Sequence, residues 1–143
     1  MSMKETIRVG VGAVVFKGDE VLLVKRGRPP FKGHWSIPGG GLHYGERLED
    51  GIAREVREET GVEIEMLGLI SVFEALPEDT GQLGHTIMVD YAAEWRAGDV
   101  IAGDDAAEAA FVPIAEARDR LEWDETRRAL AMALGMRTPM ETS

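Results

Sequence analysis

Residues 40–62 of the chain read GGLHYGERLEDGIAREVREETGV, and this stretch decides the fold. Within it, apolar residues recur at every fourth position, as expected for one face of a helix: Leu48, Ile52 and Val56. The pattern stops at Gly61, and glycine is the favoured residue just beyond a helix end. The stretch therefore predicts a helix over Arg47–Thr60 with its apolar stripe toward the core.

Three carboxylates share the edge of this stripe: Glu55, Glu58 and Glu59. At about 100° per residue, Glu59 projects between Leu48 and Ile52 on the helix. Like charges at a partly buried margin carry a desolvation cost, so either their pKa values rise or a cation lies there. Ligands that are all oxygen favour Mg²⁺ or Mn²⁺. A solvated, glutamate-rich helix surface is the alternative that this helix alone leaves open.

Length and composition indicate a globular protein. The 143 residues predict one compact domain over 1–143. There is no cysteine, so a disulfide, a zinc thiolate site and a cysteine nucleophile are excluded. No apolar run reaches the roughly 20 residues that span a bilayer, and no signal-peptide pattern is present, so we expect a cytoplasmic protein without membrane contact.

The charge is strongly acidic and unevenly distributed. A net charge of −10 argues against nonspecific binding to nucleic acid, since such binding comes largely from neutralised phosphates. Residues 1–36 nevertheless hold seven Lys and Arg against three Asp and Glu. Four of these basic residues precede the glycine-rich turn: Lys25, Arg26, Arg28 and Lys32. Each alone fits a solvated loop, whereas the group beside an acidic site could receive phosphate oxygens.

Alternating apolar patterns and turn residues predict the remaining elements. We expect strands at 7–16, 21–24, 35–37, 62–75, 86–95 and 110–112, and further helices at 114–121 and 124–134. Mixed strands with three helices predict an α/β sandwich. Gly10 and Gly12 give a G-x-G inside the first strand, but Val15 at the third position excludes a dinucleotide fingerprint. A nucleobase could stack on one of five aromatic residues, but core packing is the favoured expectation for each of them: Phe31, Trp35, Tyr44, Phe73 and Trp123.

The surroundings of the helix carry a resemblance to a known family. Nine positions over 23 residues match the complete Nudix box: Gly40, Glu46, Arg54, Glu55, Val56, Glu58, Glu59, Gly61 and Val62. The preceding Trp35–Gly40 segment and the strand order also suit this family. By this resemblance the chain is identified as a member of the Nudix hydrolases, which cleave diphosphate linkages with the help of divalent metal ions.

The resemblance implies a fold and a set of site residues. The fold would be the Nudix-type α/β/α sandwich with a mixed sheet, and the box would form a loop–helix–loop. Glu55, Glu58 and Glu59 would bind Mg²⁺ or Mn²⁺ together with the backbone carbonyl of Gly39. Arg54 would orient the carboxylates within a network that includes Glu46.

A further acidic ligand or general base usually comes from a loop outside the box. Here the matching stretch is Gly98–Glu108, which offers Asp99, Asp104, Asp105 and Glu108. We favour Asp105 and Glu108 as additional catalytic residues, and the pattern leaves the choice among the four open.

The substrate is indicated less directly. The segment from Lys25 to Trp35 and the tripeptide Gly84-His85-Thr86 resemble ADP-ribose pyrophosphatase-like members. We therefore favour a nucleoside diphosphate linked to another moiety, such as ADP-ribose, as the small-molecule partner. Its binding residues are expected to be Arg26, Arg28, Lys32 and His85.

Two other functions stay open. The first is hydrolysis of nucleoside triphosphates, including oxidised dGTP. The second is a non-catalytic, nucleotide-sensing Nudix module, which the retained box carboxylates disfavour. Related enzymes are often homodimers, so a homodimer is an open possibility here.

Overall fold

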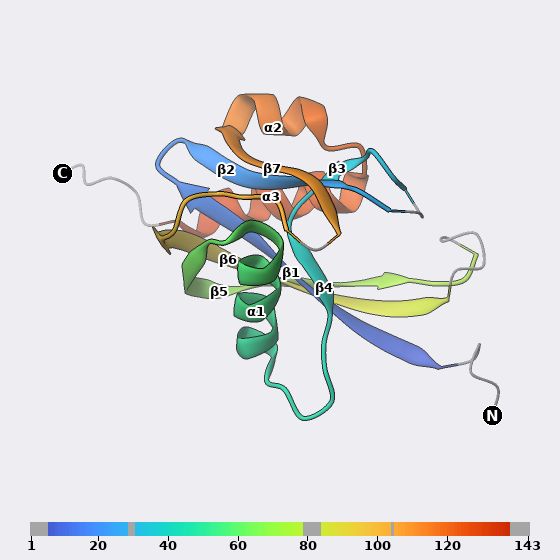
Figure 1. Cartoon of the computed structure of the whole chain (residues 1–143). Helices are drawn as coiled ribbons and strands as arrows, with labels where there is room; N and C mark the ends of the chain where they lie inside the picture. The colour runs from blue at the N-terminus through green and yellow to red at the C-terminus, as the bar shows by residue number, and fades with distance from the viewer. Residues whose placement is uncertain (1–5, 29–30, 79–83, 104, 138–143) are drawn as a thin grey trace.

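The computed structural model describes residues 6–28, 31–78, 84–103 and 105–137. Seven strands and three helices follow one another along the chain (Figure 1): β1 (Ile7–Lys17), β2 (Glu20–Arg26), β3 (Trp35–Ser36), β4 (Gly39–Gly41), α1 (Leu48–Thr60), β5 (Glu63–Ala75), β6 (His85–Ala97), β7 (Ala106–Pro113), α2 (Ile114–Arg120) and α3 (Asp124–Met136). Every predicted helix and strand is present, with bounds that differ by a few residues.

The strands form one mixed sheet around β1. Its order is β3-β2-β1-β6-β5, with β4 also paired to β1 and β7 also paired to β2. β1 pairs with β6 in parallel, whereas β1 with β2, β1 with β4, and β5 with β6 are antiparallel. β1 is therefore the strand on which the short, glycine-rich strand β4 is fixed.

Side chains alternate between two apolar cores on the two faces of this sheet. On one face Val11, Ala13 and Val15 of β1 pack with Ile52 and Val56 of α1. On the other face Val14 and Phe16 pack with residues from α2 and α3: Ala117, Ala129, Leu130 and Ala133. The helices thus cover both faces of a mixed sheet, and the predicted α/β/α sandwich is confirmed.

α1 ends at Thr60 as the sequence predicts and begins at Leu48, one residue after the predicted start. Gly61 adopts a left-handed backbone with φ of 75°, and its N–H donates to the carbonyl of Arg57. The loop before β7 satisfies two more carbonyls at this end, because Ile101 N donates to Thr60 O and Gly103 N donates to Glu59 O, both at 2.9 Å. This docking fixes the loop against the last turn of α1.

Three predictions need correction. Gly39–Gly41, expected to be a turn, is a strand, because Gly39 lies close enough to pair with Gly12 of β1. β7 begins at Ala106, four residues before the predicted start, because it pairs with β2 along most of its length.

Tyr44 and Phe31 are exposed, at 105% and 44%, since both lie in loops away from the two cores. Trp35 and Phe73 pack against the core as expected.

In the part of the chain that the structure describes, no helix has the length and apolar character needed to cross a membrane.

The packing of α1 gives a first prediction. Ile52 is completely buried against β1, so Ile52→Ala should lower the free energy of unfolding by about 2–5 kcal/mol, the usual cost of such a cavity. Ile101→Ala is the matched control, because Ile101 is 69% exposed and its loss should change the free energy by about 0.5 kcal/mol or less. Urea unfolding followed by circular dichroism measures both, and equal effects would contradict the assigned core.

Candidate active site

The glycine-rich strand β4 and the end of α1 meet at Glu59. The backbone N–H of Gly39 donates to Glu59 Oε1 at 2.9 Å. A Cβ atom on Gly39 would lie 2.2 Å from the carbonyl oxygen of Val11, so only glycine permits this approach to β1. The same approach brings the Gly39 peptide to the carboxylate.

The surroundings of Glu59 are unfavourable for a negative charge. Partial burial raises the pKa of Glu59 to about 7, although the hydrogen bond from Gly39 opposes the rise. The negative charges of Glu55 and Asp105 raise the pKa further, whereas the positive charge of Arg26 lowers it. As the helical wheel predicts, this carboxylate lies at the margin of the apolar face, and its pKa is raised.

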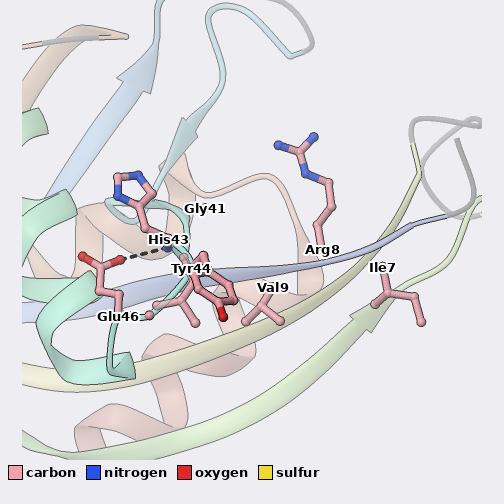
Figure 2. Close-up of a pocket in the computed structure, with 9 residues that line it drawn as sticks. Ile7, Arg8, Val9, Gly41, His43, Tyr44 and Glu46 are labelled. Atoms are coloured by element: carbon pink, nitrogen blue, oxygen red, sulfur yellow. Dashed lines mark hydrogen bonds between the residues drawn. The ribbon is translucent and has the colours of Figure 1, made fainter. Parts of the chain in front are cut away.

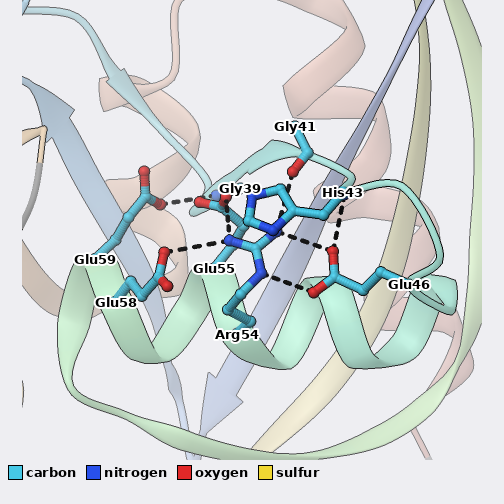
Figure 3. Close-up of polar contacts among 8 residues, drawn as sticks. All are labelled: Gly39, Gly41, His43, Glu46, Arg54, Glu55, Glu58 and Glu59. Carbon is cyan, nitrogen blue, oxygen red and sulfur yellow. Dashed lines mark hydrogen bonds and ion pairs between the residues drawn. The ribbon is translucent and has the colours of Figure 1, made fainter.

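Arg54 is the centre of a charged network (Figure 3). Its guanidinium donates to both carboxylate oxygens of Glu46, at 2.7 and 3.1 Å. It also donates to Glu55 at 2.8 Å, to Glu58 at 3.2 Å and to the carbonyl oxygen of Gly41 at 3.0 Å. One side chain therefore ties α1, β4 and the intervening loop together.

The Glu46 carboxylate is held in its ionised form. The hydrogen bonds from Arg54, and then the N–H of His43 at 2.9 Å, lower the pKa of Glu46 to about 2. In return, the hydrogen bond to Glu46 raises the pKa of Arg54 above its ordinary value. This pair is a permanent ion pair at neutral pH.

Glu55 lies directly over β4. A Cβ atom on Gly40 would come within 2.5 Å of the Glu55 carboxyl carbon and of Oε1, so the absence of a side chain leaves the space for this group. The Glu55 side chain is 14% exposed, whereas that of Glu58 is 46% exposed. The glutamates thus range from Glu55, partly buried beside β4, to Glu58 at the open surface.

Residues 6–28, 31–78, 84–103 and 105–137 contain no three carboxylates or imidazoles that already converge as a metal site. The hydrogen bonds of these glutamates explain why their carboxylates do not converge. Arg54 draws Glu55 and Glu58 toward itself, and Glu59 accepts from Gly39 instead. The donors nevertheless suit a hard cation, because all are oxygens and Glu59 lies near the negative charges of Glu55 and Asp105.

The acidic residues outside the helix fall into different places. Asp105 precedes β7, and its charge acts on Glu59. Glu108 lies further along β7 and pairs with Lys25 at 3.4 Å. The backbone of Asp99 lies beside Gly61 at the end of α1, and its side chain is exposed. Asp104 lies outside the described residues. The structure therefore brings Asp105 to the carboxylates.

The predicted basic residues are also divided. Arg26, at the end of β2, lies close enough to Glu59 to affect its pKa. Arg28 pairs with Asp105 at 3.1 Å. Lys32 is exposed on the loop before β3. His85 begins β6 and pairs with Ile7 of β1, whereas Gly39 pairs with Gly12, five residues further along β1. His85 is therefore not brought to the carboxylates.

An open hollow of about 400 Å³ lies next to the Arg54 network (Figure 2). It is lined by the start of β1 and by the loop from β4 to α1: Ile7, Arg8, Val9, Gly41, Leu42, His43, Tyr44, Gly45 and Glu46. The hollow meets the charged network at Glu46. Arg8 and His43 point to the same side in Figure 2, and the sequence did not single out Arg8 as a site residue.

Comparison with known proteins gives the family. The family model described as NUDIX domain matches residues 6–133, which includes β4, α1 and both cores. The chain belongs to the Nudix family. Within it, the MutT NUDIX hydrolase from Burkholderia pseudomallei has a similar solved structure, with a TM-score of 0.76 and 28% identity over 90% of this chain and 98% of that one.

Two sequence relatives carry functional names. A protein of Methanocaldococcus jannaschii named ADP-ribose pyrophosphatase is 37% identical over 72% of this chain. The match spans 60% of the length of that relative. A Mycobacterium tuberculosis protein named "Putative 8-oxo-dGTP diphosphatase 2" is 32% identical over 81% of this chain and 79% of its own length.

The Nudix network gives a second prediction, on titration. Arg54→Lys keeps a positive charge but loses the contact to both carboxylate oxygens, so the pKa of Glu46 should rise from about 2 toward its ordinary value of 4.5. The lowered pKa of Glu46 stabilises the fold at pH values above the pKa of the unfolded chain, and this stabilisation is lost as the pH falls through the pKa of the folded protein. Because the folded pKa is higher in the variant, the variant should lose this stabilisation at a higher pH. Carbon NMR of labelled glutamate carboxyls measures this pKa.

Arg57→Lys is the control, because Arg57 lies on the same helix and pairs with Glu63 at 3.5 Å instead. An unchanged Glu46 titration in Arg54→Lys would contradict the assigned network.

Proposed function

We propose that this Nudix chain is a hydrolase that cleaves the diphosphate of a nucleoside diphosphate linked to another moiety, with ADP-ribose as the favoured substrate. The observation that carries the proposal is Glu59. A partly buried carboxylate with a raised pKa, beside Glu55 and Asp105, has the charge environment that a divalent cation would stabilise. The M. jannaschii relative supports ADP-ribose as the substrate.

Mg²⁺, or Mn²⁺, would be held by Glu55, Glu58 and Glu59 with the carbonyl of Gly39. When bound, the metal polarises phosphoryl oxygens and lowers the pKa of a bound water. Arg54 donates to both Glu55 and Glu58, so these two carboxylates lie on the same side of α1, where both could contact one cation.

Asp105 is the proposed acceptor of the proton from the attacking water. It is the acidic residue outside the box whose charge acts on Glu59, whereas Glu108 is engaged with Lys25. The pair between Arg28 and Asp105 is exposed on both sides, so a substrate phosphate can replace Asp105 as the partner of Arg28.

Arg26 is the proposed first contact for the substrate phosphates. Its position near Glu59 places a positive charge beside the carboxylates. A diphosphate carries several negative charges, and guanidinium groups bind phosphate oxygens in pairs. Lys32 would add charge at the rim of the site, and His85, at the start of β6, remains a proposed contact for a more distant part of the substrate.

The second candidate function is pyrophosphohydrolysis of nucleoside triphosphates. It is supported by the M. tuberculosis relative, whose length the match covers more completely than that of the M. jannaschii protein. The carboxylates and Arg54 would serve both reactions, because both need a metal-assisted attack of water on phosphorus.

A product assay tests the substrate. The full chain with Mg²⁺ is incubated separately with ADP-ribose, dGTP, 8-oxo-dGTP and diadenosine polyphosphates, and the products are separated by ion-exchange chromatography. We expect AMP from ADP-ribose at a higher kcat/KM than for the other compounds. Activity confined to the triphosphates would replace the favoured substrate with the second candidate.

The metal assignment is tested at Glu59. Glu59→Gln keeps the shape but removes the charge, so we expect turnover to fall by at least about a hundredfold, as when one charge-stabilising group of an active site is removed. The rise in melting temperature on adding Mg²⁺ should also disappear. Glu49→Gln is the control, because Glu49 is an exposed residue in the first turn of the same helix. Normal turnover and a normal Mg²⁺ response in Glu59→Gln would refute the assignment.

A further inference from the structure

Asp90 of β6 is a buried carboxylate outside the network of α1. It is 6% exposed, and its Oδ1 atom has no hydrogen-bond partner within the part of the chain that the structure describes. Burial alone raises the pKa of Asp90 to about 6. A buried polar group without a partner destabilises the fold, so its presence calls for a ligand or a function.

The sheet register connects Asp90 to the active site. Asp90 lies opposite Gly12 of β1, and Gly12 lies opposite Gly39 of β4. Gly39 is the residue whose N–H donates to Glu59. Neighbouring strands lie about 4.8 Å apart, so two steps across the sheet separate Asp90 from Gly39 by about 10 Å. The backbone positions of Gly39, Gly12 and Asp90 thus lie in one row across β4, β1 and β6.

Gly12, which lies between Gly39 and Asp90, has no side chain, and the same is true of Gly10 two residues before it. A Cβ atom on Gly12 would lie 2.8 Å from Asp90 Oδ1, and one on Gly10 would lie 2.6 Å from Met88 Sδ. The side chains of β6 therefore lean over the two glycines of β1, toward β4. The same Gly12 position is 3.4 Å from Ile37 Cδ1 and from the carbonyl oxygen of Pro38, the residue before Gly39. The Asp90 carboxylate thus faces the segment that leads into the site.

The face of β1 that carries Gly10 and Gly12 is opposite to the one that packs on α1, since Val11 and Ala13 fill the α1 core. Toward the start of β1, the strands β1, β5 and β6 extend beyond the helices (Figure 1). Arg8 lies on the same face as the two glycines by strand alternation, and its side chain is exposed. Arg8 thus lies at the exposed end of this face, and Met88 and Asp90 cover Gly10 and Gly12 further along it.

A carboxylate in this position selects the chemistry of its partner. It accepts hydrogen bonds, so an N–H or O–H donor suits it. A nucleoside offers such donors on its base and its ribose. If the diphosphate lies at the α1 carboxylates, the nucleoside is the part of the substrate that spans the distance to Asp90.

We propose that Asp90 is the specificity-determining residue for the nucleoside, accepting a hydrogen bond from a base N–H or a ribose O–H donor. This inference rests on the proposed function for the location of the diphosphate. The nucleoside is placed beside the Ile37–Pro38 segment that leads into Gly39, with Asp90 at its polar end. Asp90 does not take part in the attack of water, so its loss should raise KM more than it lowers kcat.

Binding of product fragments tests this role without turnover. Isothermal titration in Mg²⁺ measures the affinities of AMP and of ribose 5-phosphate for the wild type, Asp90→Asn and Asp90→Leu. We expect both variants to bind AMP at least about tenfold more weakly, the scale of one hydrogen bond to a charged group. A loss for AMP alone assigns the donor to the base, whereas a loss for both ligands assigns it to the ribose.

Asp90→Leu and Asp90→Asn also separate this role from a structural one. Both remove an unpartnered buried charge, so both should melt at or above the wild-type temperature while binding AMP less well. Asp19→Asn is the control, because Asp19 is exposed in the turn at the opposite end of β1. In steady-state assays with ADP-ribose, KM should rise in both Asp90 variants with kcat within about threefold of wild type, since only substrate binding is lost.

Wild-type affinity for both fragments in the Asp90 variants would overturn the inference, as would a wild type that binds neither fragment. Turnover of ADP-ribose by the wild type separates the two proposals. If turnover is normal and Asp90 has no effect on binding, the inference fails and the proposed function stands. If binding depends on Asp90 but no diphosphate compound is cleaved, the proposed function fails and the nucleoside site stands.

Discussion

The close approach of β4 to both β1 and α1 is the constraint on which the site depends. Gly39 has no room for a Cβ atom because of the Val11 carbonyl, and Gly40 has none because of the Glu55 carboxylate. The β4 backbone therefore contacts the β1 backbone on one side and the Glu55 carboxylate on the other. The Gly39 N–H reaches Glu59 for the same reason, since a bulkier residue would hold the strand away from the helix.

The charges on α1 then follow from how deeply each glutamate lies. Glu55 is largely covered and paired with Arg54, Glu58 is half exposed, and Glu59 has a raised pKa. Arg54 cannot neutralise all of them, because two of its contacts are to Glu46 and one is to the Gly41 carbonyl. The network therefore fixes the geometry and leaves Glu59 outside these contacts of Arg54. Preorganised charge of this kind is what phosphoryl transfer requires.

The sequence predicts those features that depend on neighbours along the chain. The apolar stripe, the glycine stop and the position of Glu59 at the margin all follow from helical spacing, and each is found in the structure. The strand β4 was missed because three glycines in a row resemble a turn, and only pairing with β1 makes them a strand. The choice among the loop acids was equally non-local, since the docking of Gly103 on α1 fixes the loop from which Asp105 emerges.

Glycine in this fold has two distinct uses, and the sequence alone does not separate them. In β4 the missing side chain lets a peptide group approach a carboxylate. In β1 the missing side chains leave space that Met88 and Asp90 of β6 fill. An aspartate between Val89 and Tyr91, inside an apolar strand, is the signal that could have been noted. Its meaning depends on the parallel register with β1, because a shift by one residue would place the carboxylate on the other face of the sheet, against the core of α1.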